Sequence, residues 1–264
     1  MFKAISKYSW FSFVPFVLMA AVTVYLIVHG TISASYLWGT IVAWALISGL
    51  GIAVGYHRVF SHKTHDLPAW KENIILFCAA LAGQGSSITW TAIHRGYHHK
   101  HSDTEKDPHS PVAHGWWHAF FGWTLGITEA ANVVNMKYAI DLLRKPNHVW
   151  FHKHQMKILW GAPFLVAFFF DWKAALVWFC LPTGLCLLQD NLVNVFGHTK
   201  ALIGYRNFDT QDNSQNNFLL GYFGWGQGWH NNHHALPAQF NFGVSWWEVD
   251  PCVIFLPFLG PQKK

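Results

Sequence analysis

Histidine side chains gather in three short segments of this 264-residue chain, at spacings that could bring several imidazoles together. The segments HRVFSH, HRGYHH and HNNHH contain His57 and His62; His94, His98 and His99; and His230, His233 and His234. Another histidine, His198, closes the stretch NVFGH. Neutral imidazole is the commonest side-chain metal ligand and suits iron, zinc and copper. Nine imidazoles exceed the roughly four to six positions of one ion, so the sequence predicts a site for two ions.

The spacing within the segments predicts how the rings are presented. Residues at i, i+3 and i+4 share one face of a helix, so HNNHH should present three imidazoles together. The same rule places His94 and His98 on one face, with His99 adjacent. His57 and His62 are five positions apart, about 140° on an ideal helix, which suits a helix end that unwinds into a loop.

The other histidines are interpreted as structural. A lone histidine on an apolar face, such as His29, is typically packed or interfacial. His148, His152 and His154 precede an apolar segment and are expected to anchor it at a membrane interface. The remaining five could either donate hydrogen bonds around the metal ligands or be solvated loop residues, and the second interpretation is favoured; they are His65, His101, His109, His114 and His118.

Long apolar runs must position these histidines. Residues 10–30 and 36–56 contain no Lys, Arg, Asp or Glu and reach the roughly 20 residues that a helix needs to cross a hydrocarbon core. A cleaved signal peptide is the rival interpretation of the first run, but a second span follows it directly. A further pair covers residues 154–170, provided that Lys157 reaches the interface, and residues 174–196. We therefore expect one all-α integral membrane domain with four transmembrane helices in two hairpins.

The stretch 73–93 is also apolar, but Gly and polar residues at 83–87 interrupt it. A lipid-facing helix cannot easily satisfy such a break, so this stretch is expected to be interfacial or re-entrant. If it crossed the bilayer, the first two histidine segments would lie on opposite faces. With four spans, all the histidine segments share one face, in a helical cap of residues 57–153 and 197–264.

The formal charge of +5 is explained by topology rather than by nucleic acid binding. With four spans, almost all Lys and Arg fall on the side of the cap, so the positive-inside rule places both termini and the site in the cytoplasm. The four cysteines lack CxxC spacing and are interpreted as buried apolar residues in a reducing compartment, namely Cys78, Cys180, Cys186 and Cys252.

The segments HRVFSH, HRGYHHKHSDTEKDPHSP, NVFGH and GWGQGWHNNHH resemble the three histidine boxes and the Asn-x-x-x-His element of the membrane fatty acid desaturases, most closely the delta-9 (stearoyl-type) branch. The resemblance implies a cytoplasmic non-haem di-iron centre. Such a centre uses dioxygen and two electrons to introduce a cis double bond, here at the delta-9 position, into a saturated fatty acyl chain. Hydrogens on an unactivated methylene are beyond ordinary general bases, which agrees with a need for metal chemistry.

The resemblance also implies the ligands. One iron would be held by His57, His62, His94, His99 and His233, and the other by His98, His198, His230 and His234. Asn194 would position a water at the second iron. The second box is HxxxHH here, whereas many delta-9 relatives have HxxHH, and the extra residue within Gly96-Tyr97 bears on the role of His94.

Residues around the boxes are expected to support them. Candidates to hold the second ring nitrogens are Asp103, Asp107, Asp190 and Asn232. Trp90, Trp225 and Trp229 are candidate walls of an acyl channel, and Gly226 and Gly228 are expected to let the chain approach the metals closely.

Positions at which this chain departs from the animal acyl-CoA desaturases bear on its substrate. Animal acyl-CoA desaturases carry an Arg-Asp pair before the second box, where this chain has Ala92 and Ile93. They carry an Arg-Lys pair after a downstream Gly-Trp, where this chain reads TLGIT. This favours an acyl chain on membrane lipid over acyl-CoA. Electrons must come from a separate donor, such as ferredoxin or a b-type cytochrome with its reductase.

Two alternatives stay open at the level of sequence. A hydroxylase on the same scaffold would begin with the same hydrogen abstraction. A non-enzymatic metal carrier or sensor should place ionisable residues along its spans, which here are nearly devoid of them apart from Asp190.

Overall fold

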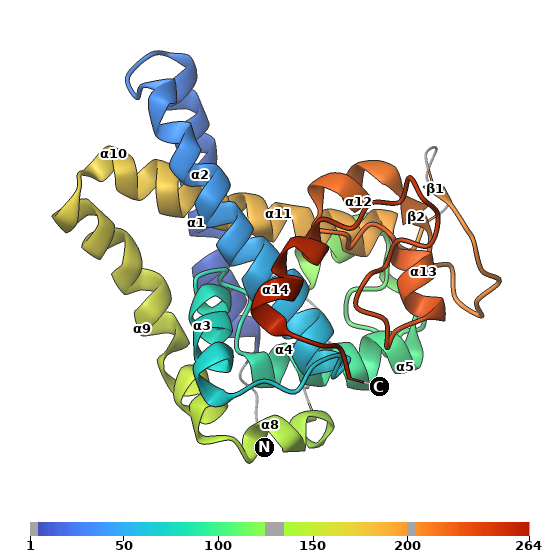
Figure 1. Ribbon diagram of the computed structural model, residues 1–264. Coiled ribbons are helices and arrows are strands. Elements are labelled where there is room, and N and C mark those ends of the chain that lie inside the picture. The colour runs from blue at the N-terminus through green and yellow to red at the C-terminus, as the bar shows by residue number, and fades with distance from the viewer. Residues whose placement is uncertain (1–4, 125–134, 200–203, 264) are drawn as a thin grey trace.

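The computed structural model describes residues 5–124, 135–199 and 204–263, which are mostly helical (Figure 1). Two helical hairpins extend from one side of the molecule, and the shorter elements gather on the other side. The short elements after the first hairpin are α3 (Ala69–Ala80), α4 (Ser87–Ile93), η3 (His94–His98), α5 (His99–His101), α6 (Pro111–His114), η4 (His118–Gly122), η5 (Met136–Ala139) and α8 (Ile140–Leu143). Those after the second are β1 (Gly204–Tyr205), β2 (Asn216–Asn217), α12 (Phe218–Phe223), α13 (His230–Ala235), η7 (Pro251–Phe255) and α14 (Leu256–Leu259).

The first hairpin joins α1 (Ile5–Val28) to a continuous helix built from η1 (Ala34–Tyr36), α2 (Leu37–Trp44) and η2 (Ala45–Ser61). Gly30, at φ +72°, makes the turn. The second helix of this hairpin runs for 28 residues and is long and apolar enough to cross a membrane. Its last turn carries His57, so the hairpin delivers the first histidine segment to the shorter elements.

The second hairpin joins α9 (Pro146–Phe169) to a helix built from α10 (Trp172–Ala175), η6 (Leu176–Cys180) and α11 (Leu181–Phe196). Asp171 caps α10 by accepting a hydrogen bond from the backbone N–H of Ala174 at 2.7 Å. Its carboxylate also accepts from the hydroxyl of Tyr36 at 2.7 Å, which ties the two hairpin tips together. The stretch Trp172–Phe196 is the second helix long and apolar enough to span. α1 and α9 do not meet that criterion over their described residues, so four spans stay a prediction.

The apolar stretch before the second histidine segment is broken, as expected. α3 ends at Ala80 and α4 begins at Ser87, and the chain between them turns at Gly83 (φ +69°) and Gly85 (φ +84°). Ser86 caps α4 through a capping box with Thr89. The break lets α4 lead directly into the second histidine segment on the same side as the first.

A small sheet lies beside the third histidine segment. β1 and β2 pair antiparallel, with Gly204 opposite Asn217 and Tyr205 opposite Asn216. Asn216 also forms an isolated bridge with Trp229, the residue before α13. The sheet therefore fixes the entry to the helix that carries HNNHH.

Candidate metal centre

Five of the predicted histidines converge in a first group at the end of η2. The ligand atoms of His57, His62, His94, His99 and His233 all lie within 4.8 Å of one another. The Nε2 atom of His233 lies 2.9 Å from that of His57 and 2.8 Å from that of His99, and the Nε2 atoms of His62 and His94 are 2.8 Å apart. The rings thus point their Nε2 atoms at one small space.

The other four predicted histidines form a second group beside it. The ligand atoms of His98, His198, His230 and His234 also lie within 4.8 Å of one another. Here the Nε2 atoms of His198 and His230 are 2.9 Å apart, and those of His98 and His234 are 3.3 Å apart. The membership of the two groups is the same as that of the two ligand sets implied by the resemblance.

The spacing of these nitrogens fits ligands of a shared ion. Two Nε2 lone pairs repel when they face each other at this distance, unless a proton or a cation lies between them. Metal–imidazole bonds of about 2.1 Å at right angles would place neighbouring nitrogens about 3 Å apart. The donor set therefore fits two metal ions, one in each group.

Wide helical turns place the first two segments. In η2 the backbone N–H of His62 donates to the carbonyl of His57 at 3.1 Å, which is an i→i+5 bond. In η3 the N–H of His99 donates to the carbonyl of His94 in the same way. As expected, the helix ends in this segment and a loop follows, since η2 ends at Ser61. The ideal 3.6-residue spacing does not apply, because a π-helical turn brings residues five apart onto one face.

The same turn corrects the expected pairing in the second segment. His94 and His98 do not act as an i, i+4 pair, because His94 joins the first group and His98 the second. Consecutive histidines are divided likewise, since His99 and His233 lie in the first group and His234 in the second. Neighbouring side chains that diverge to different groups hold the two groups side by side.

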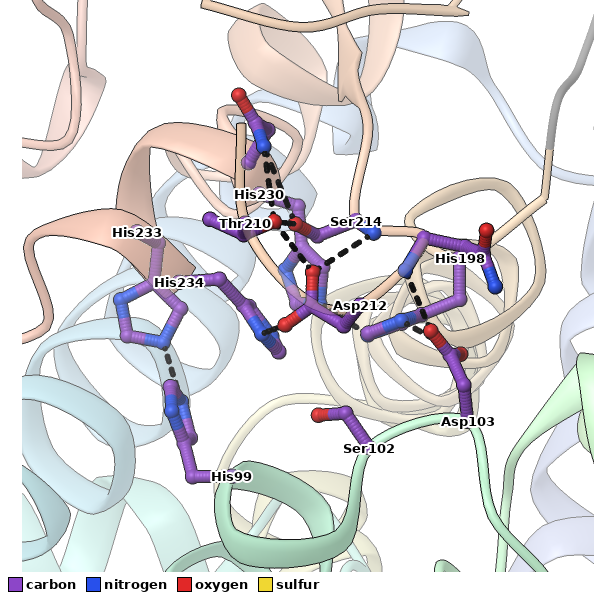
Figure 2. Close-up of polar contacts among 12 residues, drawn as sticks. His99, Ser102, Asp103, His198, Thr210, Asp212, Ser214, His230, His233 and His234 are labelled. Atoms are coloured by element: carbon purple, nitrogen blue, oxygen red, sulfur yellow. Dashed lines mark hydrogen bonds and ion pairs between the residues drawn. The ribbon is translucent and has the colours of Figure 1, made fainter. Parts of the chain in front are cut away.

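Carboxylates face the outer nitrogens of the second group (Figure 2). The Nδ1 atom of His234 lies 2.6 Å from Asp212, that of His98 lies 3.0 Å from Asp107, and that of His198 lies 3.1 Å from Asp103. A carboxylate that accepts from Nδ1–H fixes the tautomer and leaves the Nε2 lone pair for a metal. Asp103 and Asp107 were predicted in this role.

Asp212 was missed by the sequence analysis. It lies 22 positions before His234, in the loop between β1 and β2, and neither its spacing nor its neighbours distinguish it. That loop is closed by its own hydrogen bonds, with Asp212 accepting from the hydroxyl of Thr210 at 2.7 Å and from the backbone N–H of Ser214 at 3.0 Å. Only the folded loop brings the carboxylate to the site.

Two predicted partners behave differently from the expectation. Asp190 reaches His57 only through Gln227, whose Oε1 lies 2.7 Å from the Nδ1 atom of that histidine. Asn232 faces away from the imidazoles and donates to Glu248 at 2.9 Å and to the carbonyl of Phe242 at 2.9 Å. Both hydrogen bonds go to the loop after α13, so Asn232 holds that loop in place.

Burial keeps six of the ligand imidazoles neutral. It lowers the pKa of His62 to about 3 and that of His234 to about 4, and mutual repulsion among the imidazoles adds to the shift for His62. The same causes hold the pKa values of His94, His99, His230 and His233 well below the ordinary range. Neutral imidazoles are the form that binds a metal.

A cavity adjoins both groups and runs between the helices of the two hairpins. Its wall includes His57, His98 and His230, and it also includes apolar residues of the hairpins such as Phe13 and Leu159. Asn194, in α11, lines the same cavity as His230, and its role in positioning a water stays a prediction.

Of the predicted tryptophan walls, Trp90 lines the cavity. Trp225 and Trp229 pack elsewhere, so their expected role is wrong. The ring of Trp225 packs against that of Trp44 in a tilted arrangement with ring centroids 4.9 Å apart, and the Nε1 atom of Trp229 donates to the carbonyl of Val249. Both rings join the last segment of the chain to its neighbours.

Several histidines expected to be solvated or interfacial are buried. His65 is buried against the ring of Phe240, and His118 is buried, with its Nε2 atom 2.9 Å from the carbonyl of Pro108. His109 is buried too, with its Nδ1 atom 3.2 Å from Asp107, so that carboxylate bridges it to His98.

His148 is fully buried, with its Nδ1 atom 2.8 Å from the hydroxyl of Ser87. His152 is half-buried and pairs with Ser86 at 2.7 Å. These two contacts join α9 to the start of α4. The side chains therefore position the helix before the second box instead of anchoring at a membrane surface.

Gly226 and Gly228 serve close approaches, but to protein rather than to a metal. A Cβ on Gly226, at φ +76°, would lie 2.1 Å from the carboxylate of Asp250. One on Gly228 would lie 2.2 Å from the backbone nitrogen of Gly221. The glycines let the chain before α13 pack tightly against α12 and the loop before η7.

The stretch predicted to lack the CoA contacts lies largely outside the described residues. Thr124 is described, whereas residues 125–128 are not. Ala92, at the other position, is fully buried in the core, and Ile93 is half-buried.

Comparison with known proteins adds an independent finding. The sequence profile of the family described as fatty acid desaturase matches residues 33–256. Delta-9 acyl-lipid desaturase 2 of Arabidopsis thaliana is 31% identical over 217 residues, which are 82% of this chain and 69% of that protein. The matched range covers all nine histidines of the two groups.

Two cyanobacterial proteins are similar to the same degree. The sn-1 stearoyl-lipid 9-desaturase of Anabaena variabilis is 33% identical over 78% of this chain and 73% of its own length. The sn-2 palmitoyl-lipid 9-desaturase of Nostoc sp. (strain 36) is 33% identical over 83% of this chain and 77% of its own length.

Proposed function

This chain belongs to the fatty acid desaturase family, and on that premise we propose that it introduces a cis double bond at the delta-9 position of a saturated acyl chain carried on membrane lipid. It is thus an oxidoreductase. The observation that carries the finer proposal is the convergence of nine imidazoles into two groups beside one cavity.

The acyl-lipid substrate is supported by two observations. The similar proteins named above are acyl-lipid and stearoyl- or palmitoyl-lipid desaturases. Ala92 and Ile93 also offer no charge to a CoA polyphosphate. The overall reaction converts a CH₂–CH₂ unit, dioxygen, two electrons and two protons into CH=CH and two waters, so a separate donor such as ferredoxin or a b-type cytochrome with its reductase must supply the electrons.

In this proposal two iron ions, bound by the two histidine groups, supply the oxidising chemistry with dioxygen. The chain itself does the positioning. The carboxylates of Asp107 and Asp212 hold the Nδ1 protons of their histidines, and Asn194 holds a water beside the second group. The cavity takes one acyl segment against His57 and His230 and excludes bulk water from it.

The proposed setting is the bilayer, with four spans in two hairpins and with both termini and the metal centre in the cytoplasm. The two long apolar helices and the family support membrane association. The distribution of Lys and Arg supports the orientation. A tag at each terminus tests this orientation. Tags that a membrane-impermeant reagent reaches only after the membrane enclosing the cytoplasm is permeabilised would agree with it.

The deciding experiment is expression in a host without delta-9 activity, with a working electron donor, followed by mass spectrometry of the lipid acyl chains. We expect delta-9 alkenes from the natural chain and none from His233→Ala. Hydroxylated chains without alkenes would favour the hydroxylase instead. Alkenes found only in acyl-CoA, with lipid-linked chains unchanged, would overturn the proposal that the substrate chain is carried on membrane lipid.

A further inference from the structure

A buried carboxylate in α11 is linked to the first histidine group through one amide. The Oδ1 atom of Asp190 accepts from the Nε2 atom of Gln227 at 2.8 Å. The Oε1 atom of Gln227 lies 2.7 Å from the Nδ1 atom of His57. His57 and Gln227 are both buried, and the cavity wall includes all three residues. The link thus runs from the second hairpin, along the wall of the cavity, to the last turn of η2.

The direction of these hydrogen bonds is fixed by chemistry. Asp190 also accepts from the side-chain amides of Gln84 and, at 3.4 Å, Gln189, so three amide donors surround one acceptor. The amide of Gln227 must then turn its NH₂ group to Asp190 and its oxygen to His57. An amide oxygen only accepts, so the proton of His57 sits on Nδ1 and the lone pair on Nε2. That lone pair faces His233, inside the first group.

The first group differs here from the second. In the second group, carboxylates lie directly against three of the four imidazoles. In the first group, the carboxylate that serves His57 stands one side chain further away, with a neutral amide between. The amide transmits the orientation of the carboxylate without placing its charge against the ring.

We propose that Asp190 is a positioning residue, which fixes the metal-binding tautomer of His57 through Gln227 and so sets the metal affinity of the first group. The proposal rests on the proposed function, because it assumes that each group holds an ion. It assigns the effect of Asp190 to one of the two ions and leaves the other unchanged.

The test is metal binding by the purified full-length chain in detergent, with no turnover required. Fe(II) is titrated anaerobically and bound metal is counted by elemental analysis; Co(II) is titrated in parallel and followed by its visible absorption. In Asp190→Asn the new amide can offer its NH₂ group to Gln227, which then turns its own NH₂ group towards His57 and displaces the Nδ1 proton. We expect affinity for one of two ions to fall by about 10- to 100-fold and the other to stay as in the natural chain.

A swap of the carboxylate distinguishes orientation from general damage. In the double variant Gln227→Glu/Asp190→Asn, the carboxylate would accept directly from His57, and the amide at 190 would donate to it. We expect this variant to recover most of the lost affinity. In Gln227→Leu the side chain cannot accept from His57, so we expect the affinity for the same ion to fall as in Asp190→Asn. This variant tests the link if Asp190→Asn fails to fold.

Thr183→Val is the matched control. Thr183 is fully buried in the same helix and donates to the carbonyl of Leu81, so its variant changes buried polarity without touching the link. We expect natural affinity for both ions. Equal weakening in this control, or no recovery in the double variant, would overturn the positioning role.

The two levels of proposal fail differently. If the natural chain binds fewer than two equivalents, the two-ion centre fails and the positioning role fails with it. Suppose instead that the natural chain binds two ions, and that Asp190→Asn and Gln227→Leu each bind both ions as tightly as the natural chain does. Only the positioning role is then overturned.

Discussion

The guanidinium of Arg58 lies 2.7 Å from the carboxylate of Asp250, and both side chains are completely buried. Arg58 follows His57 at the end of η2, and Asp250 precedes η7, so the pair joins the first histidine segment to the last part of the chain. The guanidinium also lies 3.8 Å from the ring centroid of Phe242, a ring that in turn contacts the rings of His57 and His233. The pair therefore clamps the loop after α13 under the first group.

Asp250→Asn should destabilise the protein by about 3 to 5 kcal/mol, because it leaves the charge of Arg58 buried without its partner. Unfolding by denaturant in detergent measures the change. The control is Lys263→Met, which breaks an ion pair of 2.7 Å with Asp66 at the surface and should cost no more than about 1 kcal/mol. Equal losses in the two variants would contradict the clamp.

Ligand deletions should act on one ion at a time. His62 belongs to the first group and His198 to the second. We expect His62→Ala and His198→Ala each to retain about one of the two irons, since the other donor set is intact. Elemental analysis of the purified variants gives the stoichiometry. The control is His29→Ala, at an exposed position, which should retain both irons. Loss of both irons in His62→Ala or His198→Ala would argue for a single shared site.

The carboxylate that sequence analysis missed should matter for the second ion. Asp212→Asn keeps the shape of the side chain but weakens its hold on the Nδ1 proton of His234, so metal affinity should fall by about 10- to 100-fold. Titration with Co(II), followed by absorption, measures it. Asp209→Asn, three positions away and exposed, should bind as the natural chain does. A natural affinity in Asp212→Asn would remove this carboxylate from the site.

Glu72 should make stability depend on pH. Burial alone would raise the pKa of this carboxyl, but hydrogen bonds from His148, Asn147 and Lys145 outweigh it and lower the pKa to about 2. Ionised Glu72 thus stabilises the fold above its ordinary pKa, 4.5, and that contribution is lost as the pH falls towards about 2.

Glu72→Gln should therefore cost about 1 to 3 kcal/mol at pH 7, and its difference from the natural chain should shrink from pH 4.5 downwards. Thermal unfolding in detergent across this range is the measurement. Glu105→Gln, at an exposed position, should track the natural chain at every pH. A difference that stays constant with pH would show that Glu72 acts by packing alone.

The nine histidines could be predicted from the sequence because they lie in short, dense segments. Their division into two groups came from the resemblance to the desaturase motifs and not from their spacing. Their outer partners could be predicted only in part. Asp107 stands nine positions after His98, which it contacts, and Asp103 stands four positions after His99, although it contacts His198. Asp212 and Gln227 are brought in by loops whose course depends on tertiary hydrogen bonds.

Helix geometry was the other limit. Ideal periodicity of 3.6 residues per turn misplaced the pairs His57 and His62, and His94 and His98, because both segments adopt π-helical turns. The turn in η3 is closely packed at Gly96, where a Cβ would lie 2.2 Å from the ring of Tyr138.

The π-helical turn of η3 also bears on the length of the second histidine segment. This chain has HxxxHH where many delta-9 desaturases have HxxHH, and in an α-helix one inserted residue would rotate every later side chain by about 100°. A turn closed from i to i+5 takes up the additional residue locally, so His94 and His99 still meet in one group. An additional residue in this motif is thus compatible with one histidine group, because the wider turn keeps the flanking imidazoles together.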